Sequence, residues 1–378
     1  GRVRWEYGAD GVHVGSTLLD ASIGGSQLAA LFDLGLRSDP EADDYISLSF
    51  GLRDADASAY RDYLPYIVSP QLQEWLDASI EAGHVARAAF TYHAVFQQPE
   101  HPFRHALQLA LDVQDAAVSY HPDWPAVRDA TGRVLVDEDR VCVELDAGHV
   151  LQGTLGSTRV EVLPRHSDGR LRVAAELKGG LEDGLRVLGN APLAKATGGA
   201  LSGWKGSGDM ALDLQLDMPF AEGLMAPDAR LDLTVTIDAA RLYIAEPGLQ
   251  LESLHGDIGF DLQRGLRSEA IDAMLWGRPV RARIGSVDGS GRRIAVNVAG
   301  TTDVARVAAW LKWDPGGLVT GIAPFTLEVQ QQEAYGFGFL LRSPLRDVNS
   351  TLPAPLAKAP AEAPAEAARK PWVRVEET

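Results

Sequence analysis

Residues 210–220 read MALDLQLDMPF, and the alternation within this stretch decides the fold. Every second position carries a large apolar side chain: Met210, Leu212, Leu214, Leu216, Met218 and Phe220. The positions between them include Asp213, Gln215 and Asp217. Successive side chains of a β-strand point to opposite faces, so the stretch predicts a strand with one apolar face and one polar face. What covers the apolar face is therefore the central question about function.

The same period of two runs through most of the chain. It occurs in residues 26–37, 87–96, 105–120, 230–244, 256–262, 292–300 and 334–342. Turn signals separate these segments, such as Ser-Asp-Gly at 167–169 and Asp-Gly-Ser-Gly at 288–291. Alternating runs bounded by such turns are typical of antiparallel strands. The pattern predicts an all-β fold with a few short helices.

The sequence also repeats itself. Three segments with helical spacing, residues 63–83, 192–204 and 303–313, lie roughly 120 residues apart. A shift of 124 positions places Phe90 on Leu214 and keeps the apolar parity in step over four strands without a gap. Repeated modules that contact only their neighbours form long arrays. We therefore expect an elongated architecture, divided into a partial module (1–53), a helix-plus-strands module (54–188), its second copy (189–301), the start of a further module (302–352), and a Pro/Ala/Glu-rich linker into a truncated strand (353–378).

Composition excludes several classes of function. Lys and Arg total 35 against 52 Asp and Glu, a net charge of −17, which disfavours nucleic acid and anionic membrane surfaces. The single cysteine, Cys142, alternates with Val141 and Val143 and is expected to be an ordinary strand side chain. No run of about 18 apolar residues occurs, and residues 1–10 lack the apolar core of a signal peptide. Both ends alternate like strands, so we expect an internal piece of a longer protein.

No catalytic or metal-binding motif stands out. His101 and His105 have the i,i+4 spacing of helical metal ligands, but Pro102 lies between them and no glutamate follows His101. The glycine-rich residues 203–209 precede a strand, so they lack the helix N-terminus that binds phosphate. Abundant carboxylates leave a carbohydrate-active enzyme as a remote alternative. We expect no enzyme, no metal and no cofactor.

The apolar face could pack on a second sheet in a sandwich, on helices, or on a ligand. The helical segments are too few and too short to cover so many strands. Two features favour a ligand: the repeat would extend one apolar surface along the chain, and its side chains are mostly aliphatic. Large apolar patches are not left to water and mark binding sites. A sandwich remains the alternative.

Three segments point to a known family: residues 60–94, 119–137 and 191–220. They closely resemble the YhdP-type proteins of the AsmA-like family, the bridge-like phospholipid transport proteins of Gram-negative bacteria. The likeness covers nearly the whole chain. It implies an internal fragment of a periplasmic, curved antiparallel sheet that forms an open hydrophobic groove. It also implies phospholipid as the partner, an inner-membrane anchor in the full-length protein, flanking modules of the same chain, and inner- and outer-membrane proteins at the two ends.

Apolar parity selects the residues expected to line the groove. They are Phe90, Tyr92, Leu107, Leu109, Leu111 and Val113 in one module, and Leu212, Leu214, Leu216, Leu231, Leu233, Val235 and Ile237 in the next. Packing of these side chains on other protein side chains is the alternative for each position. Trp75 and Leu76 are expected to dock their helix onto the module instead. A structural scaffold for outer-membrane assembly, which transports nothing, is the alternative function.

Overall fold

The structure is a computed structural model of the 378-residue chain. It describes residues 1–23, 25–39, 41–62, 69–96, 104–122, 124–163, 169–188, 203–220, 223–245, 248–286, 294–314, 316–332, 336–353 and 357–359. The chain packs into two compact units, which are described separately. Unit 1 comprises residues 1–177 and 215–229, and unit 2 comprises residues 178–214 and 230–378.

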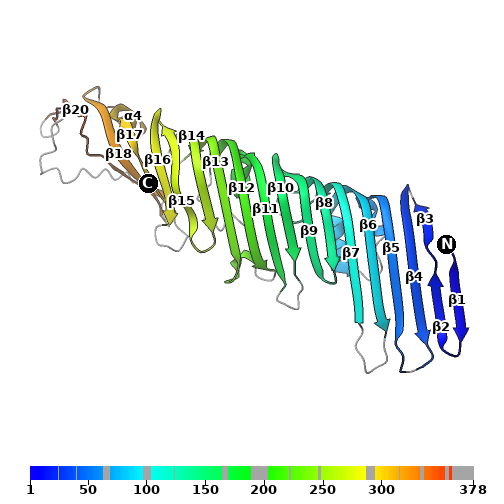
Figure 1. Cartoon of the computed structure of the whole chain (residues 1–378). Helices are drawn as coiled ribbons and strands as arrows, with labels where there is room; N and C mark the ends of the chain where they lie inside the picture. The colour runs from blue at the N-terminus through cyan, green and yellow to red at the C-terminus, as the bar shows by residue number, and fades with distance from the viewer. Residues whose placement is uncertain are drawn as a thin grey trace. The chain divides into compact units, whose positions relative to one another are not determined.

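Unit 1 is a meander of antiparallel strands (Figure 1). From β4 to β10, each strand pairs with the next one in the sequence. The elements are β1 (Val3–Gly8), β2 (Gly11–Ser16), β3 (Leu19–Ile23), β4 (Ser26–Arg37), β5 (Asp44–Asp56), η1 (Ala57–Asp62), α1 (Pro70–Ser79), β6 (Ile80–Phe96), β7 (Arg104–Val118), β8 (Val127–Asp137), β9 (Arg140–Val150), β10 (Gly153–Val162), most of β11 (Arg170–Gly180) and η3 (Gly223–Met225).

Unit 2 continues the same pattern of sequential antiparallel pairs from β13 to β19 (Figure 1). Its elements are α2 (Leu181–Leu188), the first part of β12 (Lys205–Pro219), β13 (Arg230–Ile244), β14 (Leu249–Asp261), β15 (Gly265–Leu275), β16 (Arg278–Ser286), β17 (Ile294–Asp303), α4 (Val304–Trp310), β18 (Val319–Gln332), β19 (Gly336–Arg342) and β20 (Val348–Ser350).

The predicted fold class is confirmed. Strands account for 70% of the structure and helices for 10%, and the strands form one hydrogen-bonded antiparallel sheet that does not close on itself. Hairpin connections dominate because the turn signals lie between alternating runs. Residues 210–219 of the MALDLQLDMPF stretch lie in β12, and the predicted strand at 26–37 coincides with β4.

The helices differ from expectation in their bounds. The helical spacing predicted over 63–83 corresponds to α1 at Pro70–Ser79, because the Ser69 hydroxyl caps its first turn and Ile80 already begins β6. The segment predicted at 303–313 contains the shorter α4, capped by Asp303. Most of the segment predicted at 192–204 lies outside the described residues. Helix α2 was not predicted from the sequence.

The elements recur in order along the chain, so the repeated architecture is confirmed. Strands β6 to β11 and β12 to β17 form two series whose matching strands begin 122 to 126 residues apart. The helical segments η1, α2 and α4 each follow directly on a strand and begin at residues 57, 181 and 304. Module boundaries at 54, 189 and 302 remain a prediction, since the two compact units divide the chain at other positions.

Bulges also recur within the strands. In unit 1 the register shifts between Val113 and Ala116 of β7, and in unit 2 between Ile237 and Ala240 of β13. A bulge adds a residue to one strand, which bends that strand and strengthens its twist. Further shifts occur in the neighbouring pairs β6–β7, β8–β9, β14–β15 and β15–β16. Bulges in consecutive strands bend the sheet within each unit away from a flat surface.

Candidate functional site

In unit 1 the strand register collects apolar side chains on one side of the sheet. Residues directly opposite each other in an antiparallel pair point to the same face. One row runs through Leu28, Leu52, Ala88, Leu111, Val134, Val143 and Val160, and the next through Ala30, Phe50, Phe90, Leu109, Val136, Val141 and Val162. Each row crosses seven strands without a polar residue. We call this side the apolar face of unit 1.

The six groove residues predicted in unit 1 all lie on this face. Tyr92 is opposite Leu107, and Val113 is opposite Val85. Phe90 is buried and stacks on Phe50 with ring centroids 4.8 Å apart. The other five predicted residues are half-buried. The register therefore brings together every predicted residue of this module.

Unit 2 has an apolar face built in the same way. A row of small and aliphatic residues crosses the seven strands β13 to β19: Ile237, Gly256, Ile271, Ala282, Val298, Leu327 and Leu341. Leu233 is opposite Phe260 and Val235 is opposite Ile258, so these predicted residues share one face with Ile237. Leu231, Leu233 and Ile237 are buried and Val235 is half-buried.

Strand β12 contributes the remaining predicted residues. Leu212, Leu214 and Leu216 are half-buried, whereas Asp213 and Gln215 between them are exposed. The alternation predicted from MALDLQLDMPF is thus present in the burial of the strand. The row partners in β4, β5, β8 to β10 and β14 to β19 were not predicted as groove residues. Their own period of two carried the signal, but only the register shows which of them share a face.

The opposite side of unit 1 is a polar face with paired charges. Arg87, Asp112, Arg133 and Glu144 lie directly opposite one another on β6 to β9. Asp112 accepts hydrogen bonds from Arg87 at 2.6 Å and from Arg133 at 2.9 Å. The hydrogen bond from Arg133, and to a smaller extent that from Arg87, lowers the pKa of the Asp112 carboxyl below its usual value. These exposed pairs keep one side of the sheet compatible with water and add little stability individually.

Among the described strands, extensive contacts join only strands that are neighbours in the hydrogen-bonded sheet. Short helical segments do pack on the sheet. A Cβ on Gly184 of α2 would lie 2.5 Å from the Met210 methyl group, so α2 is close to the apolar side of β12. Helix α4 contacts β17 and β18.

Trp75 and Leu76 were expected to dock helix α1 onto the module, and Trp75 makes a hydrogen bond to it. Trp75 is 46% exposed and donates an indole N–H to the Tyr120 carbonyl at 3.4 Å. Leu76 is half-buried. Trp75 therefore contacts the module through this hydrogen bond, while much of its indole ring stays exposed.

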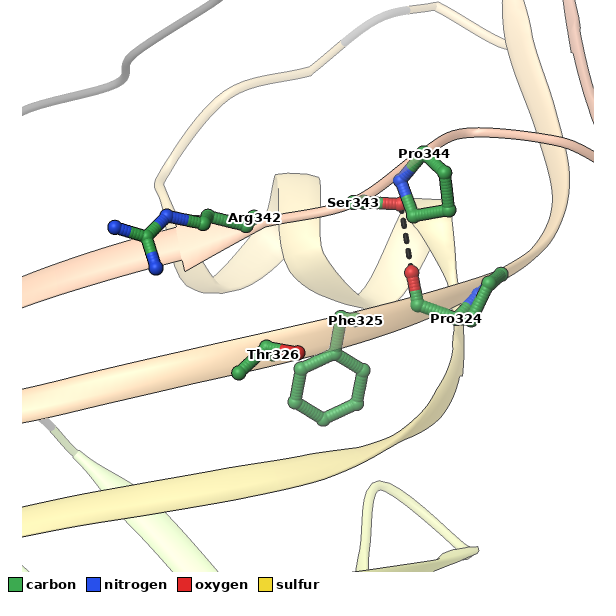
Figure 2. Close-up of a pocket in the computed structure, with 6 residues that line it drawn as sticks. All are labelled: Pro324, Phe325, Thr326, Arg342, Ser343 and Pro344. Carbon is green, nitrogen blue, oxygen red and sulfur yellow. Dashed lines mark hydrogen bonds between the residues drawn. The ribbon is translucent and has the colours of Figure 1, made fainter.

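A pocket of about 340 Å³ lies at the edge of β18 (Figure 2). Its lining is Pro324, Phe325, Thr326, Arg342, Ser343 and Pro344. Strand β19 pairs with β18 up to Arg342, and β20 resumes the pairing at Val348. The Ser343 hydroxyl donates to the Pro324 carbonyl at 2.7 Å across this break. The pocket is open to solvent and involves only two neighbouring strand segments, whereas the apolar rows cross seven strands. We therefore take the apolar rows, and not this pocket, as the candidate site.

In the described part of the chain, no group of three or more His, Cys, Asp or Glu side chains could hold a metal ion. His101 is outside the described residues, and His105 lies 3.7 Å from Glu138. Burial is the main cause of a raised pKa for the Cys142 thiol, and nearby carboxylates add to it. The reactive thiolate form is therefore disfavoured. Among these residues no helix is long and apolar enough to cross a membrane.

The fold and its apolar faces define a class: repeated, open, antiparallel sheets that carry unbroken aliphatic rows on one side and charge pairs on the other. Within this class the chain belongs to the YhdP protein family, whose model matches residues 1–367.

One curated relative is the "Intermembrane phospholipid transporter YhdP" of Escherichia coli (strain K12). It is 23% identical over 322 residues, which is 83% of this chain and 25% of the relative. The chain thus spans about a quarter of the length of that relative. No solved structure matches the chain.

Proposed function

We propose that this chain is a section of a lipid conduit in the cell envelope. Its apolar faces form a groove that shields phospholipid acyl chains as the lipid moves between the inner and outer membranes. The observation that carries the proposal is the pair of apolar rows that cross seven strands of unit 1 without a polar residue. The name of the Escherichia coli relative supports the same function.

The energetics favour such a surface. Each acyl CH₂ group kept from water is worth about 0.8 kcal/mol, so two chains need shielding on the order of 20 kcal/mol. A continuous aliphatic face supplies this shielding at every point along its length. Because the face and a bilayer interior shield the tails about equally, movement along the face is nearly isoenergetic. Direction must then come from proteins at the ends or from the membranes themselves.

The thirteen predicted residues are the contacts we assign to lipid. Their side chains are aliphatic or aromatic, and no charged group lies in the two rows of unit 1 that include Phe90 and Leu111. Head groups would extend from the open side of the groove into water, so no head-group pocket is needed. In this proposal the protein carries lipid and does not catalyse a reaction. The chain lies in the periplasm, and the full-length protein is anchored in the inner membrane.

The further partners in this proposal are flanking modules of the same longer chain and membrane proteins at its two ends. The repeated modules would extend the groove in both directions, because each module needs only its neighbours. The division into modules at residues 54, 189 and 302 belongs to this proposal as well.

Native mass spectrometry of gently purified protein tests the proposal. Phospholipid should copurify with the chain, and Leu214→Asp combined with Leu233→Asp should remove most of it while the protein remains folded. The same double substitution in the full-length protein should abolish lipid transport. A folded chain that carries no lipid would instead support the scaffold alternative. Transport retained by the folded double variant would also count against the conduit.

A further inference from the structure

Four aromatic rings meet on the apolar face of unit 2. Trp276 lies 6.0 Å from Trp310 and 6.4 Å from Phe325, and Trp310 contacts Phe339 edge to face at 6.3 Å, all measured between ring centroids. Such pairs gain energy beyond their burial. We call these four residues the ring cluster. It joins the β15–β16 turn, helix α4 and strands β18 and β19.

Helix α4 holds Trp310 over the sheet. Asp303 caps the helix by accepting a hydrogen bond from the Ala305 N–H at 2.9 Å. Val304 then packs against buried Val319 and Ala323 of β18. Ala308, one turn further on, is only 2% exposed. The helix is thereby pressed onto the side of β18 that carries Ala323, and its last residue, Trp310, reaches Phe339.

The rings extend from the sheet edge formed by the β15–β16 turn onto the apolar face. Phe325, Leu327 and Val329 alternate along β18, and Val329 is directly opposite Phe339. Leu327, which lies between the two ring positions, is only 1% exposed. Leu109 and Leu111 of unit 1 are half-buried by comparison. Trp310 therefore lies where the proposed groove would carry an acyl chain.

Two of the four ring positions, those of Trp276 and Trp310, are aliphatic in the preceding copy. Trp276 begins a two-residue turn with a φ of 53°, and Leu151 holds the same position in the β9–β10 turn with a φ of 55°. Val187 occupies the position in α2 that corresponds to Trp310, counted from the start of each helix. The substitution of aromatic for aliphatic side chains distinguishes this part of the chain.

We propose that Trp310 is a displaceable plug in the acyl-chain path, and that an acyl chain competes with the Trp310 ring for the surface formed by Phe325, Leu327 and Phe339. This inference rests on the proposed function. Exchange of a ring for an acyl chain buries apolar surface of similar extent in both states, so the two states differ little in free energy. A lipid that moves along the groove can then displace the Trp310 ring. In the absence of lipid, the ring covers this part of the groove.

Photolabelling tests the plug. The chain is equilibrated with vesicles of phosphatidylethanolamine that carry a diazirine in one acyl chain, and the labelled peptides are mapped after illumination. Trp310→Ala should increase labelling of residues 325–329 at least threefold over the unsubstituted chain. Trp310→Phe retains a ring and should label as the unsubstituted chain does. The matched control Trp313→Ala removes a tryptophan that is 47% exposed three residues away, and should change nothing.

A second variant guards against loss of the fold. Trp276→Leu installs the side chain present in the matching turn, removes two of the three ring contacts and leaves α4 unchanged. It should give an intermediate increase in labelling, with cooperative thermal unfolding retained. Equal labelling of 325–329 in all variants, with strong labelling of β6 and β7, would overturn the plug and leave the conduit standing. Absence of labelling in both units would overturn the conduit and the plug with it.

Discussion

Asp115 and Ala239 adopt the same left-handed backbone conformation, with φ of 51° and 52°, at bulges 124 residues apart. Asp129 and Ser253 form a second such pair, both with φ of 50° and again 124 residues apart. Non-glycine residues rarely adopt this conformation, because Cβ approaches the following carbonyl oxygen. The recurrence shows that the two copies share the bend as well as the strands.

The first prediction concerns this backbone. Ala239→Gly should raise the free energy of unfolding by about 0.5–1 kcal/mol, because glycine adopts a positive φ without strain. Ala239→Val should lower it by about 1–3 kcal/mol. Urea unfolding measures both. Ala106→Gly in β7, where φ is ordinary, is the control and should be destabilising by about 0.5–1 kcal/mol. The prediction is wrong if Ala239→Gly and Ala106→Gly behave alike.

The second prediction separates the two faces with neighbouring residues. Val134 belongs to an apolar row of unit 1, opposite Leu111, whereas Leu135 points to the polar face and is 38% exposed. Val134→Asp should reduce the phospholipid that copurifies with the chain by at least half, since a carboxylate next to acyl chains must be desolvated. Leu135→Asp adds the same charge and should leave the lipid unchanged. Equal losses from both variants would contradict a one-sided lipid surface.

Much of this arrangement could be predicted from the sequence. Parity placed Phe90 and Leu109 on one face because a period of two needs no tertiary information. The bulges could not be predicted, since nothing local in Ala239 or Ser253 favours a positive φ and the register of the neighbouring strand imposes it. Helix α2 was missed because it is only eight residues long and includes Gly184, although Leu181, Leu185 and Leu188 have helical spacing. The ring cluster was not predicted, because Trp276 and Trp310 come into contact only when α4 is packed on the sheet.

The third prediction concerns acid stability. Arg170 has a side chain only 19% exposed and binds Asp217 at 2.6 Å and Asp228 at 2.5 Å. Burial raises the pKa of Asp217, but hydrogen bonds from Arg170 and Arg172 outweigh this effect and hold the pKa below its usual value. Arg170 also lowers the pKa of Asp228. Carboxyls with a lowered folded pKa stabilise the fold above their usual pKa, and this contribution is lost as the pH falls through the folded value.

The free energy of unfolding should therefore fall as the pH decreases from about 5 to 3. Asp217→Asn should lower it by about 1–3 kcal/mol at pH 7, because Arg170 and Arg172 lose a charged partner. The same variant should show a flatter pH dependence than the unsubstituted chain. Guanidinium unfolding at a series of pH values measures both effects. Asp213→Asn, on the exposed side of the same strand, serves as the control. An unchanged slope for Asp217→Asn would show that this network does not set acid stability.

The last prediction concerns the contact between α2 and β12. A Cβ at Gly184 would lie 2.5 Å from the methyl group and 2.6 Å from the sulfur of Met210, which is itself 5% exposed. Gly184→Val should lower the free energy of unfolding by about 1–3 kcal/mol, because the buried end of the Met210 side chain must move out of its packed position. Met210→Ala alone should also be destabilising, since it leaves a cavity. The double variant should be destabilised by at least 1 kcal/mol less than the sum of the two single effects, because the valine side chain at position 184 fills part of the cavity left by Met210→Ala. Thermal unfolding of the four chains completes this double-mutant cycle. Strict additivity would show that α2 does not rest on Met210 in solution.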